Sequence, residues 1–188
     1  GAEISCERSV QAVSNLFYGL PINGYCAINM GAIPLINDAV GGIDLQAIET
    51  LDFGEYRIQA GDQLHLEGMD AYYYLHNRDI NKSRTAVGRL ERQKQYLTAY
   101  AAKAMETLKR DITFPVTLYG TLSKYMVTDI SVDEVGYLAT QVLNYSFSGD
   151  NMHVLKGEVT KGEKYEEFRV DEDALYRLIL DTFYEKIK

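Results

Sequence analysis

The sequence has no tryptophan and only two cysteines among its 188 residues, Cys6 and Cys26. Two cysteines cannot form the disulfide framework of a small secreted domain, so we expect two buried thiols. The chain also lacks a run of eighteen apolar residues and a signal-peptide pattern, so it is not expected to contain a membrane helix. No GxSxG, P-loop, GxGxxG, CxxC or HxxxH pattern is present, which leaves hydrolase, nucleotide-binding and zinc-site predictions without a motif.

Basic residues are also in short supply. The 27 acidic residues outnumber the 19 lysines and arginines, giving a net charge of −8. Domains that bind DNA or RNA are usually basic, so no nucleic-acid partner is expected. Apolar residues make up 46% of the chain, enough for one folded domain with a core. The 15 tyrosines offer amphipathic surface that suits a ligand that is part lipid and part sugar.

The most informative stretch covers residues 61–109, where two predicted helices flank a polar, basic turn. The first helix is expected over 67–77 and the second over about 86–109. Apolar residues on the second helix recur with helical spacing and predict one buried face: Leu90, Leu97, Ala101, Ala104 and Leu108.

A different stripe of the second helix carries residues three or four positions apart: Arg89, Gln93, Tyr96 and Tyr100. Arg92 lies beside this stripe, and Arg78 leaves the first helix just before the turn. Guanidinium groups donate paired hydrogen bonds to phosphate, and a helix N-terminus favours anions. The pattern indicates a phosphate or pyrophosphate site. The alternative is a solvated helix face whose arginines pair with acids such as Glu91 or Asp79.

The order AYYYLHNR, a short loop, then GRLERQ resembles the signature of the LytR-CpsA-Psr family. In that family, Ala-Leu-Ala-Tyr-Val-Arg-x-Arg is followed by Asp-x-x-Arg-x-x-Arg-Gln. Three further segments are similar and follow in the same order along the chain: residues 33–45, 64–68 and 126–143. The resemblance implies an α/β fold with three α-β-α layers around a central mixed sheet, incomplete at its N-terminus. We expect residues 1–188 to form one partial domain, with 115–188 as its C-terminal α/β portion.

Members of this family transfer glycopolymers from a polyprenyl-pyrophosphate carrier to the cell wall. The resemblance therefore implies a phosphotransferase whose partners are a polyprenyl-pyrophosphate glycolipid and a cell-wall acceptor. Arg78 and Arg89 match the motif and would bind phosphate oxygens, and Gln93 would orient one of them; these three are the predicted catalytic residues. Arg92 also matches and would bind substrate or instead buttress the sheet. The alternative function is a non-catalytic glycolipid-binding or interaction domain.

Two positions depart from the family motif. His76 stands where the family has the first Arg, and Ala86 stands where it has Asp. His76 would act as a smaller, titratable substrate-binding donor to phosphate, or as a helix-end histidine near the last carbonyls. Ala86 cannot hold Arg89 or handle a proton as the Asp would.

The resemblance begins at Gly1, in the middle of the family domain. In the family the preceding part supplies strands and the acidic residues that hold a divalent metal, so Mg²⁺ is implied without ligands in this chain. The family's N-terminal membrane helix would likewise lie upstream, which implies a location on the extracellular face of the cytoplasmic membrane. A strand such as 22–29 or 43–48 would then have an open edge, and we expect a dimer or a partner chain that supplies the missing strands.

Two more residues are predicted to bind substrate: Tyr96, on the polar stripe, and Asp44, just after a Gly-Gly turn. For Asp44 an exposed edge position is the alternative. Tyr56 and Arg57 are weaker candidates for a lid. Surface or structural roles are expected for the two isolated histidines, His65 and His153.

Periodicity predicts further helices over residues 6–18, 33–40, 115–126 and 132–143 and after residue 171. Strands are expected over 22–29, mostly buried, and over 43–48, 56–58, 152–155 and 165–170. Helix caps are predicted at three residues: Ser5, Ser131 with Glu134 in a capping box, and Asp171. Asn37 and Asp38 are expected on an exposed helix face.

Overall fold

The computed structural model describes residues 1–79, 85–163 and 166–185. The chain divides into two compact units, a terminal unit of residues 1–23 and 152–188 and a central unit of residues 24–151. The predicted C-terminal portion, 115–188, contributes to both units. The turn predicted between the two central helices includes residues 80–84, which lie outside the described residues, as does residue 165 at the start of a predicted strand.

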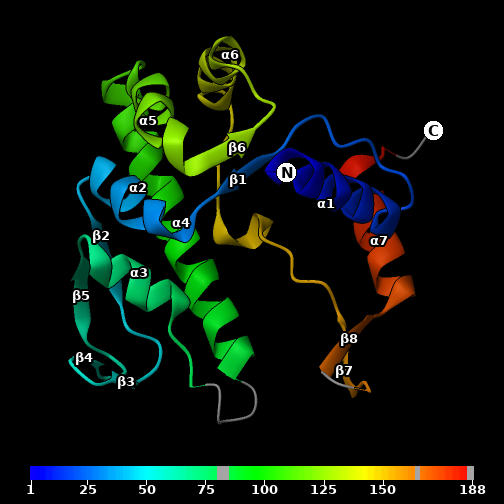
Figure 1. Cartoon of the computed structure of the whole chain (residues 1–188), viewed down its shortest axis with the longest axis horizontal. Coiled ribbons are helices and arrows are strands. Elements are labelled where there is room, and N and C mark those ends of the chain that lie inside the picture. Colours follow the sequence, from blue (N-terminus) through cyan, green and yellow to red (C-terminus); the bar gives the residue numbers. More distant parts are fainter. Residues whose placement is uncertain (80–84, 164–165, 186–188) are drawn as a thin grey trace. The chain divides into compact units, whose positions relative to one another are not determined.

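The central unit combines short strands with helices (Figure 1). Its first half contains β1 (Cys26–Ile28), the short 3-10 helix η1 (Met30–Ala32), α2 (Ile33–Ala39), β2 (Ile43–Gln46), β3 (Leu51–Phe53), β4 (Tyr56–Ile58) and β5 (Gln63–Leu66). Its second half contains α3 (Met69–His76), α4 (Thr85–Arg110), α5 (Phe114–Leu122), η2 (Ser123–Tyr125), β6 (Met126–Thr128), α6 (Val132–Val142) and η3 (Gly149–Asn151). The two helices predicted on either side of the basic turn are confirmed as α3 and α4.

The strands that the structure describes form four two-stranded antiparallel sheets, β1–β6, β2–β5, β3–β4 and β7–β8. The mixed α/β class is confirmed, but these strands do not join into one central mixed sheet. Burial alternates along β2. Ile43 and Leu45 are buried while Asp44 and Gln46 are exposed, so only one face of the β2–β5 sheet packs against the core and the other meets water, as is common for antiparallel sheets.

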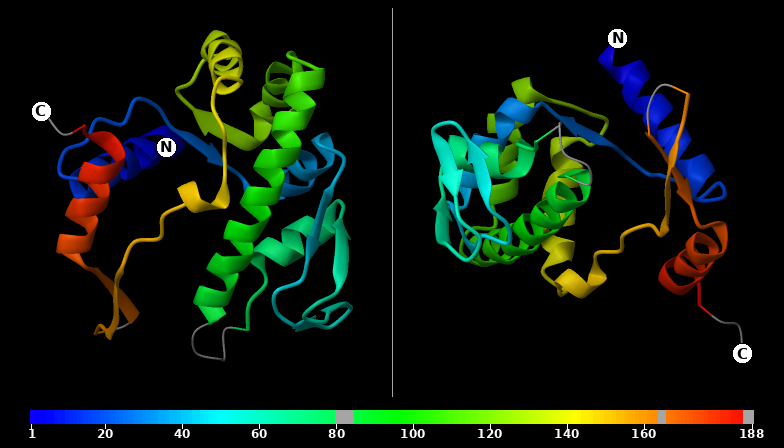
Figure 2. Two further views of the ribbon diagram at one scale, coloured as in Figure 1. Left: turned by 180° about the vertical axis from the view of Figure 1, so that it is seen from behind. Right: turned by 90° about the horizontal axis from the view of Figure 1, so that it is seen from below.

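The core of the central unit lies where α2, α3 and α4 pack on the β2–β5 and β3–β4 sheets (Figure 2). Its buried residues include Ile43, Leu45, Leu51, Ile58, Leu66, Ala71, Tyr74 and Tyr96. Asn37 was predicted to be exposed, and this prediction was wrong because its side chain is fully buried. Its Nδ2 donates to the Leu66 carbonyl at 2.8 Å, and its Oδ1 accepts from the Tyr96 hydroxyl at 3.1 Å. These partners satisfy the amide inside the core.

The terminal unit contains α1 (Ala2–Leu16), β7 (Gly157–Lys161), β8 (Glu166–Val170) and α7 (Glu172–Phe183). The predicted cap at Asp171 is confirmed, since its Oδ1 accepts from the Ala174 amide at 3.0 Å. The predicted cap at Ser5 was wrong because α1 begins three residues earlier and Ser5 lies inside it. The strand predicted over 152–155 was also displaced, and β7 starts at Gly157, where it can pair with β8.

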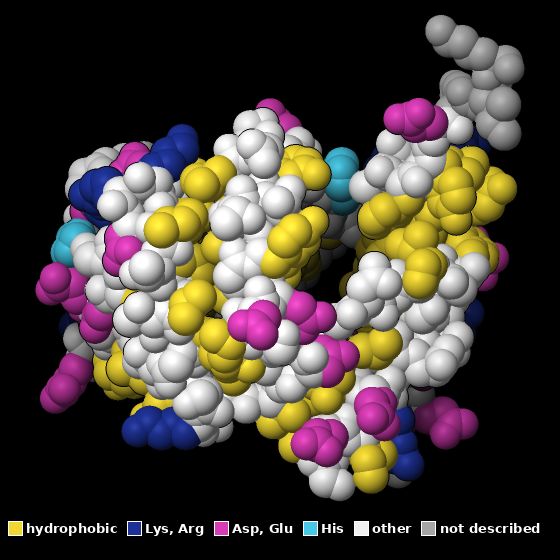
Figure 3. Space-filling model, turned by 90° about the horizontal axis from the view of Figure 1, so that it is seen from above, with side chains coloured by type: hydrophobic (Ala, Val, Ile, Leu, Met, Phe, Trp, Pro, Cys, Tyr) yellow, Lys and Arg dark blue, Asp and Glu magenta, His cyan; other side chains and the backbone are white. Residues whose placement is uncertain are grey.

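Several side chains are more exposed than the sequence suggested. All three residues of β1 are exposed, although this strand was predicted to be mostly buried. Cys26 lies on it and is exposed, Cys6 is half-buried, and both are free thiols, so the expectation of two buried thiols was wrong. Large apolar side chains also remain at the surface, as Figure 3 shows.

Candidate functional site

The end of α3 is fastened to the first half of α4 by two adjacent side chains of α4. Gln93 Nε2 donates to the Leu75 carbonyl at 3.2 Å, and Arg92 Nη2 donates to the Asn77 carbonyl. The last carbonyls of a helix have no partner within the helix itself. These two side chains therefore provide hydrogen-bond donors for carbonyls at the C-terminal end of α3 and hold that end against α4.

Arg92 is the most enclosed member of the predicted cluster, with 1% of its surface exposed. Its Nη1 lies 2.6 Å from Glu49 Oε1, and its guanidinium carbon lies 5.7 Å from the centre of the Tyr74 ring. Burial lowers the pKa of Arg92, and the Glu49 carboxylate opposes that shift. Its Nε is buried and has no hydrogen-bond partner in the described part of the chain. This geometry favours the buttressing alternative for Arg92 over direct contact with substrate.

Glu49 was not predicted to belong to the site. It lies between β2 and β3, where nothing in the local sequence distinguishes it from other surface acids. Only the approach of α4 to this connection brings the carboxylate to Arg92.

Arg78 and Arg89 lie on either side of the contact that Arg92 and Gln93 make with the end of α3. Arg78 directly follows Asn77 and is exposed, and Arg89 lies three residues before Arg92 on α4 and is half-buried. Within the part of the chain that the structure describes, neither guanidinium has a hydrogen-bond or ion-pair partner. Both can therefore donate to an anion, and the pairing with neighbouring acids expected of a solvated helix face is not formed there.

The two departures from the family motif lie beside these arginines. His76 is the last residue of α3, is exposed, and stacks on Tyr72 with ring centroids 5.0 Å apart. A positive charge is favourable at this end of a helix, which fits the helix-end alternative, and exposure also leaves the ring accessible next to Arg78. Ala86 lies exposed in the first turn of α4.

The two other predicted substrate-binding residues point to different parts of the central unit. Tyr96 is 4% exposed, packs in the core and stacks on Tyr100 with centroids 6.1 Å apart. Burial raises the pKa of Tyr96. Asp44 lies on the exposed face of β2, as its alternative prediction had it. No hydrogen bond or ion pair between described residues joins either side chain to Arg78 or Arg89.

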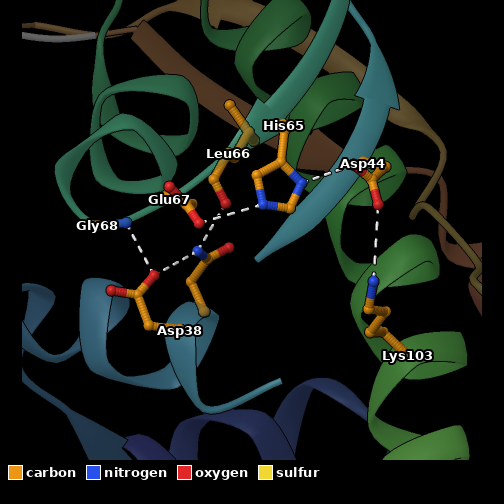
Figure 4. A network of polar contacts seen from close by, with 8 residues as sticks. Asp38, Asp44, His65, Leu66, Glu67, Gly68 and Lys103 are labelled. Carbon is orange, nitrogen blue, oxygen red and sulfur yellow. Dashed lines mark hydrogen bonds and ion pairs between the residues drawn. The ribbon is translucent and has the colours of Figure 1, made fainter. Parts of the chain in front are cut away.

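Asp44 instead belongs to a surface network on the outer face of the β2–β5 sheet (Figure 4). Its Oδ1 lies 2.6 Å from Nδ1 of His65, its cross-strand neighbour, and its Oδ2 lies 3.6 Å from Lys103 Nζ. His65 Nε2 lies 3.3 Å from Glu67 Oε1. The hydrogen bond with His65 lowers the pKa of Asp44, and the same bond raises the pKa of His65. β5 was not predicted from the sequence, so its pairing with β2 was not predicted either. Polar and apolar residues alternate in both strands, and this alternation is the pattern that predicts a strand.

The predicted lid residues belong to the β3–β4 hairpin. The Tyr56 hydroxyl donates to the Asp70 carbonyl at 3.2 Å, and its ring lies 5.2 Å from that of Tyr73. Arg57 Nε lies 3.1 Å from Asp52 Oδ1 across the hairpin. These contacts hold the hairpin together and attach it to α3.

The described residues offer no ligand set for the implied divalent metal. Among the described residues, no group of three or more histidine, cysteine, aspartate or glutamate side chains is arranged to hold an ion. No helix in the described ranges is long and apolar enough to cross a membrane.

Comparisons with known proteins agree with the fold. The teichoic acid transferase TagU of Oceanobacillus iheyensis is 29% identical over 163 residues, which cover 85% of this chain and 48% of that protein. The chain thus spans about half the length of the curated relatives it matches.

Two solved structures share the fold. The crystal structure of the Enterococcus faecalis transcriptional regulator EF0465 matches with a TM-score of 0.73 and 22% identity, over 93% of this chain and 63% of that one. The crystal structure of B. subtilis TagU matches with a TM-score of 0.62 and 22% identity, over 97% and 73%. The model of the LytR_cpsA_psr family matches residues 5–179, and the chain therefore belongs to that family.

Proposed function

We propose that this chain forms part of a phosphotransferase that moves a glycopolymer from a polyprenyl-pyrophosphate carrier to a cell-wall acceptor. The observation that supports this most directly is a pair of arginines, Arg78 and Arg89, for which the described residues provide no hydrogen-bond or ion-pair partner. Both lie beside the contact between the end of α3 and α4 in a member of this family. Its relatives are named as polyisoprenyl-teichoic acid–peptidoglycan teichoic acid transferases. Such a reaction places the protein on the extracellular face of the cytoplasmic membrane, where the acceptor is.

In this proposal, Arg78 and Arg89 donate charge-assisted hydrogen bonds to the oxygens of the carrier pyrophosphate. A hydroxyl of the acceptor attacks the phosphorus that bears the glycopolymer, and the bond from that phosphorus to the polyprenyl phosphate breaks. The guanidiniums stabilise the negative charge that grows on the departing phosphate. In this proposal Gln93 contributes indirectly, because its amide donates to the Leu75 carbonyl at the end of α3. A metal is not assigned a step, since the described residues do not provide its ligands.

Binding measurements test the role of the two arginines. Arg78→Ala and Arg89→Ala should each weaken binding of geranylgeranyl pyrophosphate by about 1.5–3 kcal/mol, the range for hydrogen bonds to charged groups. Isothermal titration calorimetry gives the affinity and circular dichroism the melting temperature, which should barely change. Arg110→Ala, which removes an exposed arginine from the far end of the same helix, is the matched control. Unchanged affinity together with a large loss of melting temperature would show that the two arginines are structural.

A non-catalytic glycolipid-binding protein is the second candidate. It is favoured by the two departures from the family motif, where His76 replaces an arginine and Ala86 replaces an aspartate. The enzyme and the binder differ in turnover and not in affinity. Release of polyprenyl phosphate from a loaded carrier, measured with an acceptor present, distinguishes them.

A further inference from the structure

The peptide group between Asn77 and Arg78 is held by one buried side chain. Arg92 Nη2 donates to the Asn77 carbonyl, and that carbonyl lies in the same rigid plane as the Arg78 amide. Arg92 also follows Arg89 by three residues, so both lie on neighbouring positions of one helix surface. The placement of Arg92 therefore bears on the backbone at Arg78 and on the helix surface that Arg92 shares with Arg89, the two arginines proposed to bind phosphate.

Glu49 in turn determines the placement of Arg92. Its Oε1 lies 2.6 Å from Arg92 Nη1, and no other carboxylate pairs with Arg92 among the described residues. A guanidinium with 1% exposure requires an opposite charge close by, since burying it without one is costly. The Glu49 side chain is itself 38% exposed, so it connects the buried guanidinium with the surface.

Gly88 leaves the space that the Glu49 carboxylate occupies. A Cβ at this position of α4 would lie 2.9 Å from Oε2 and 3.0 Å from Oε1 of Glu49, too close for an ordinary contact. The carboxylate therefore occupies its present position beside α4 because residue 88 has no side chain, and a Cβ there would force the carboxylate to shift.

We propose that Glu49 is a positioning residue for the pyrophosphate site, acting through Arg92 on Arg78 and Arg89 without touching the substrate. This role rests on the proposed function, and it predicts that the effect of Glu49 on anion binding depends on the arginines that it positions.

A double-mutant cycle with inorganic pyrophosphate as the probe tests this dependence. Glu49→Gln keeps the size of the side chain but removes its charge. It should weaken pyrophosphate binding roughly fivefold in the wild-type background and less than about twofold in the Arg78→Ala background, since coupled residues are not additive. Asp52→Asn is the matched control, because Asp52 also pairs with an arginine, Arg57, at 3.1 Å but on the β3–β4 hairpin. It should leave binding unchanged.

The outcomes separate the two hypotheses. Suppose that Arg78→Ala and Arg89→Ala both weaken pyrophosphate binding. The role of Glu49 is then overturned, and the phosphate site stands, if Glu49→Gln has no effect or if it weakens binding equally in the wild-type and Arg78→Ala backgrounds. If neither arginine variant changes pyrophosphate affinity, the proposed site falls and the role of Glu49 with it.

A second variant reaches the same contact without removing a charge. Gly88→Ala introduces the Cβ that meets the Glu49 carboxylate, while alanine is a better helix residue than glycine. We expect weaker pyrophosphate binding with an unchanged or higher melting temperature, so the test holds even if Glu49→Gln does not fold. Full affinity in a well-folded Gly88→Ala protein would contradict the proposal.

Discussion

At the scale of single residues, the ion pair between Asp44 and His65 makes stability sensitive to pH. Their hydrogen bond raises the pKa of His65 above its ordinary value of 6.5 and lowers that of Asp44 below 3.8. The contribution of His65 to the free energy of unfolding is fully present below pH 6.5 and is lost as the pH rises through its folded-state pKa. The contribution of Asp44 to the free energy of unfolding is fully present above pH 3.8 and is lost as the pH falls through the folded-state pKa of Asp44. The pair therefore stabilises most between these two values, aided by Lys103 and Glu67, which also face it.

We expect His65→Gln to lower the urea midpoint of unfolding more at pH 5 than at pH 8. His65 is charged at the lower pH, and its stabilising contribution declines as the pH rises above 6.5 towards its raised folded-state pKa. Both side chains are exposed, so the difference is modest. Asp52→Asn serves as the control, because its arginine partner keeps its charge over this range. An equal loss at both pH values would contradict the assigned protonation of His65.

At the scale of elements, the turn between α2 and β2 depends on two consecutive glycines. Gly41 and Gly42 have φ angles of +81° and +76°, which side-chain-bearing residues rarely adopt. Their surroundings differ. A Cβ at Gly41 would meet nothing within 4 Å, while one at Gly42 would lie 2.7 Å from His65 Nε2 and 2.9 Å from the Leu66 carbonyl oxygen. The turn is therefore packed against β5 on one side only.

This asymmetry predicts different costs for the same substitution. Gly41→Ala should reduce the free energy of unfolding by about 1–2 kcal/mol, the cost of a left-handed backbone for an L residue. Gly42→Ala carries that cost and must also move the β5 backbone, which adds at least about 1 kcal/mol. Urea denaturation of both variants gives the comparison. Equal losses would show that β5 yields freely to the added methyl group.

At the scale of the whole molecule, open strand edges and exposed apolar side chains remain. β1 pairs only with β6 and β2 only with β5 among the strands that the structure describes. Ile28 on β1 is 45% exposed. Unpaired edges invite pairing with another chain, and large apolar patches are uncommon on soluble monomers. A dimer, or a complex with a chain that supplies further strands, stays our prediction.

Light scattering over a range of concentrations tests self-association. We expect the wild-type chain to associate at high micromolar concentration and Ile28→Lys to weaken this, because an edge lysine opposes strand pairing. Ile4→Lys changes a similarly exposed isoleucine on the helix α1 and is the control. A strict monomer at all concentrations would exclude a dimer through this edge, and equal effects of both variants would point to general apolar contact.

Residues that are close together in the chain were enough to predict several of the helices and the family. Helical periodicity located α3 and α4, and the spacing of Ser131 and Glu134 predicted a capping box that the structure contains. Motif order identified the family that the comparison with its model then confirmed. These features depend on residues close together in the chain, so their spacing is enough to specify them.

Which polar residues are buried, and what they bind, depends on contacts between elements that are far apart in the sequence. Asn37 is enclosed because Tyr96 and the Leu66 carbonyl, 59 and 29 residues away, provide its partners. Arg92 is buried and joins Glu49 to the Asn77 carbonyl, because Glu49, 43 residues earlier, lies against α4. Packing between elements brings such partners together. Their hydrogen bonds offset the cost of burying the polar groups, and a short stretch of sequence does not predict these bonds.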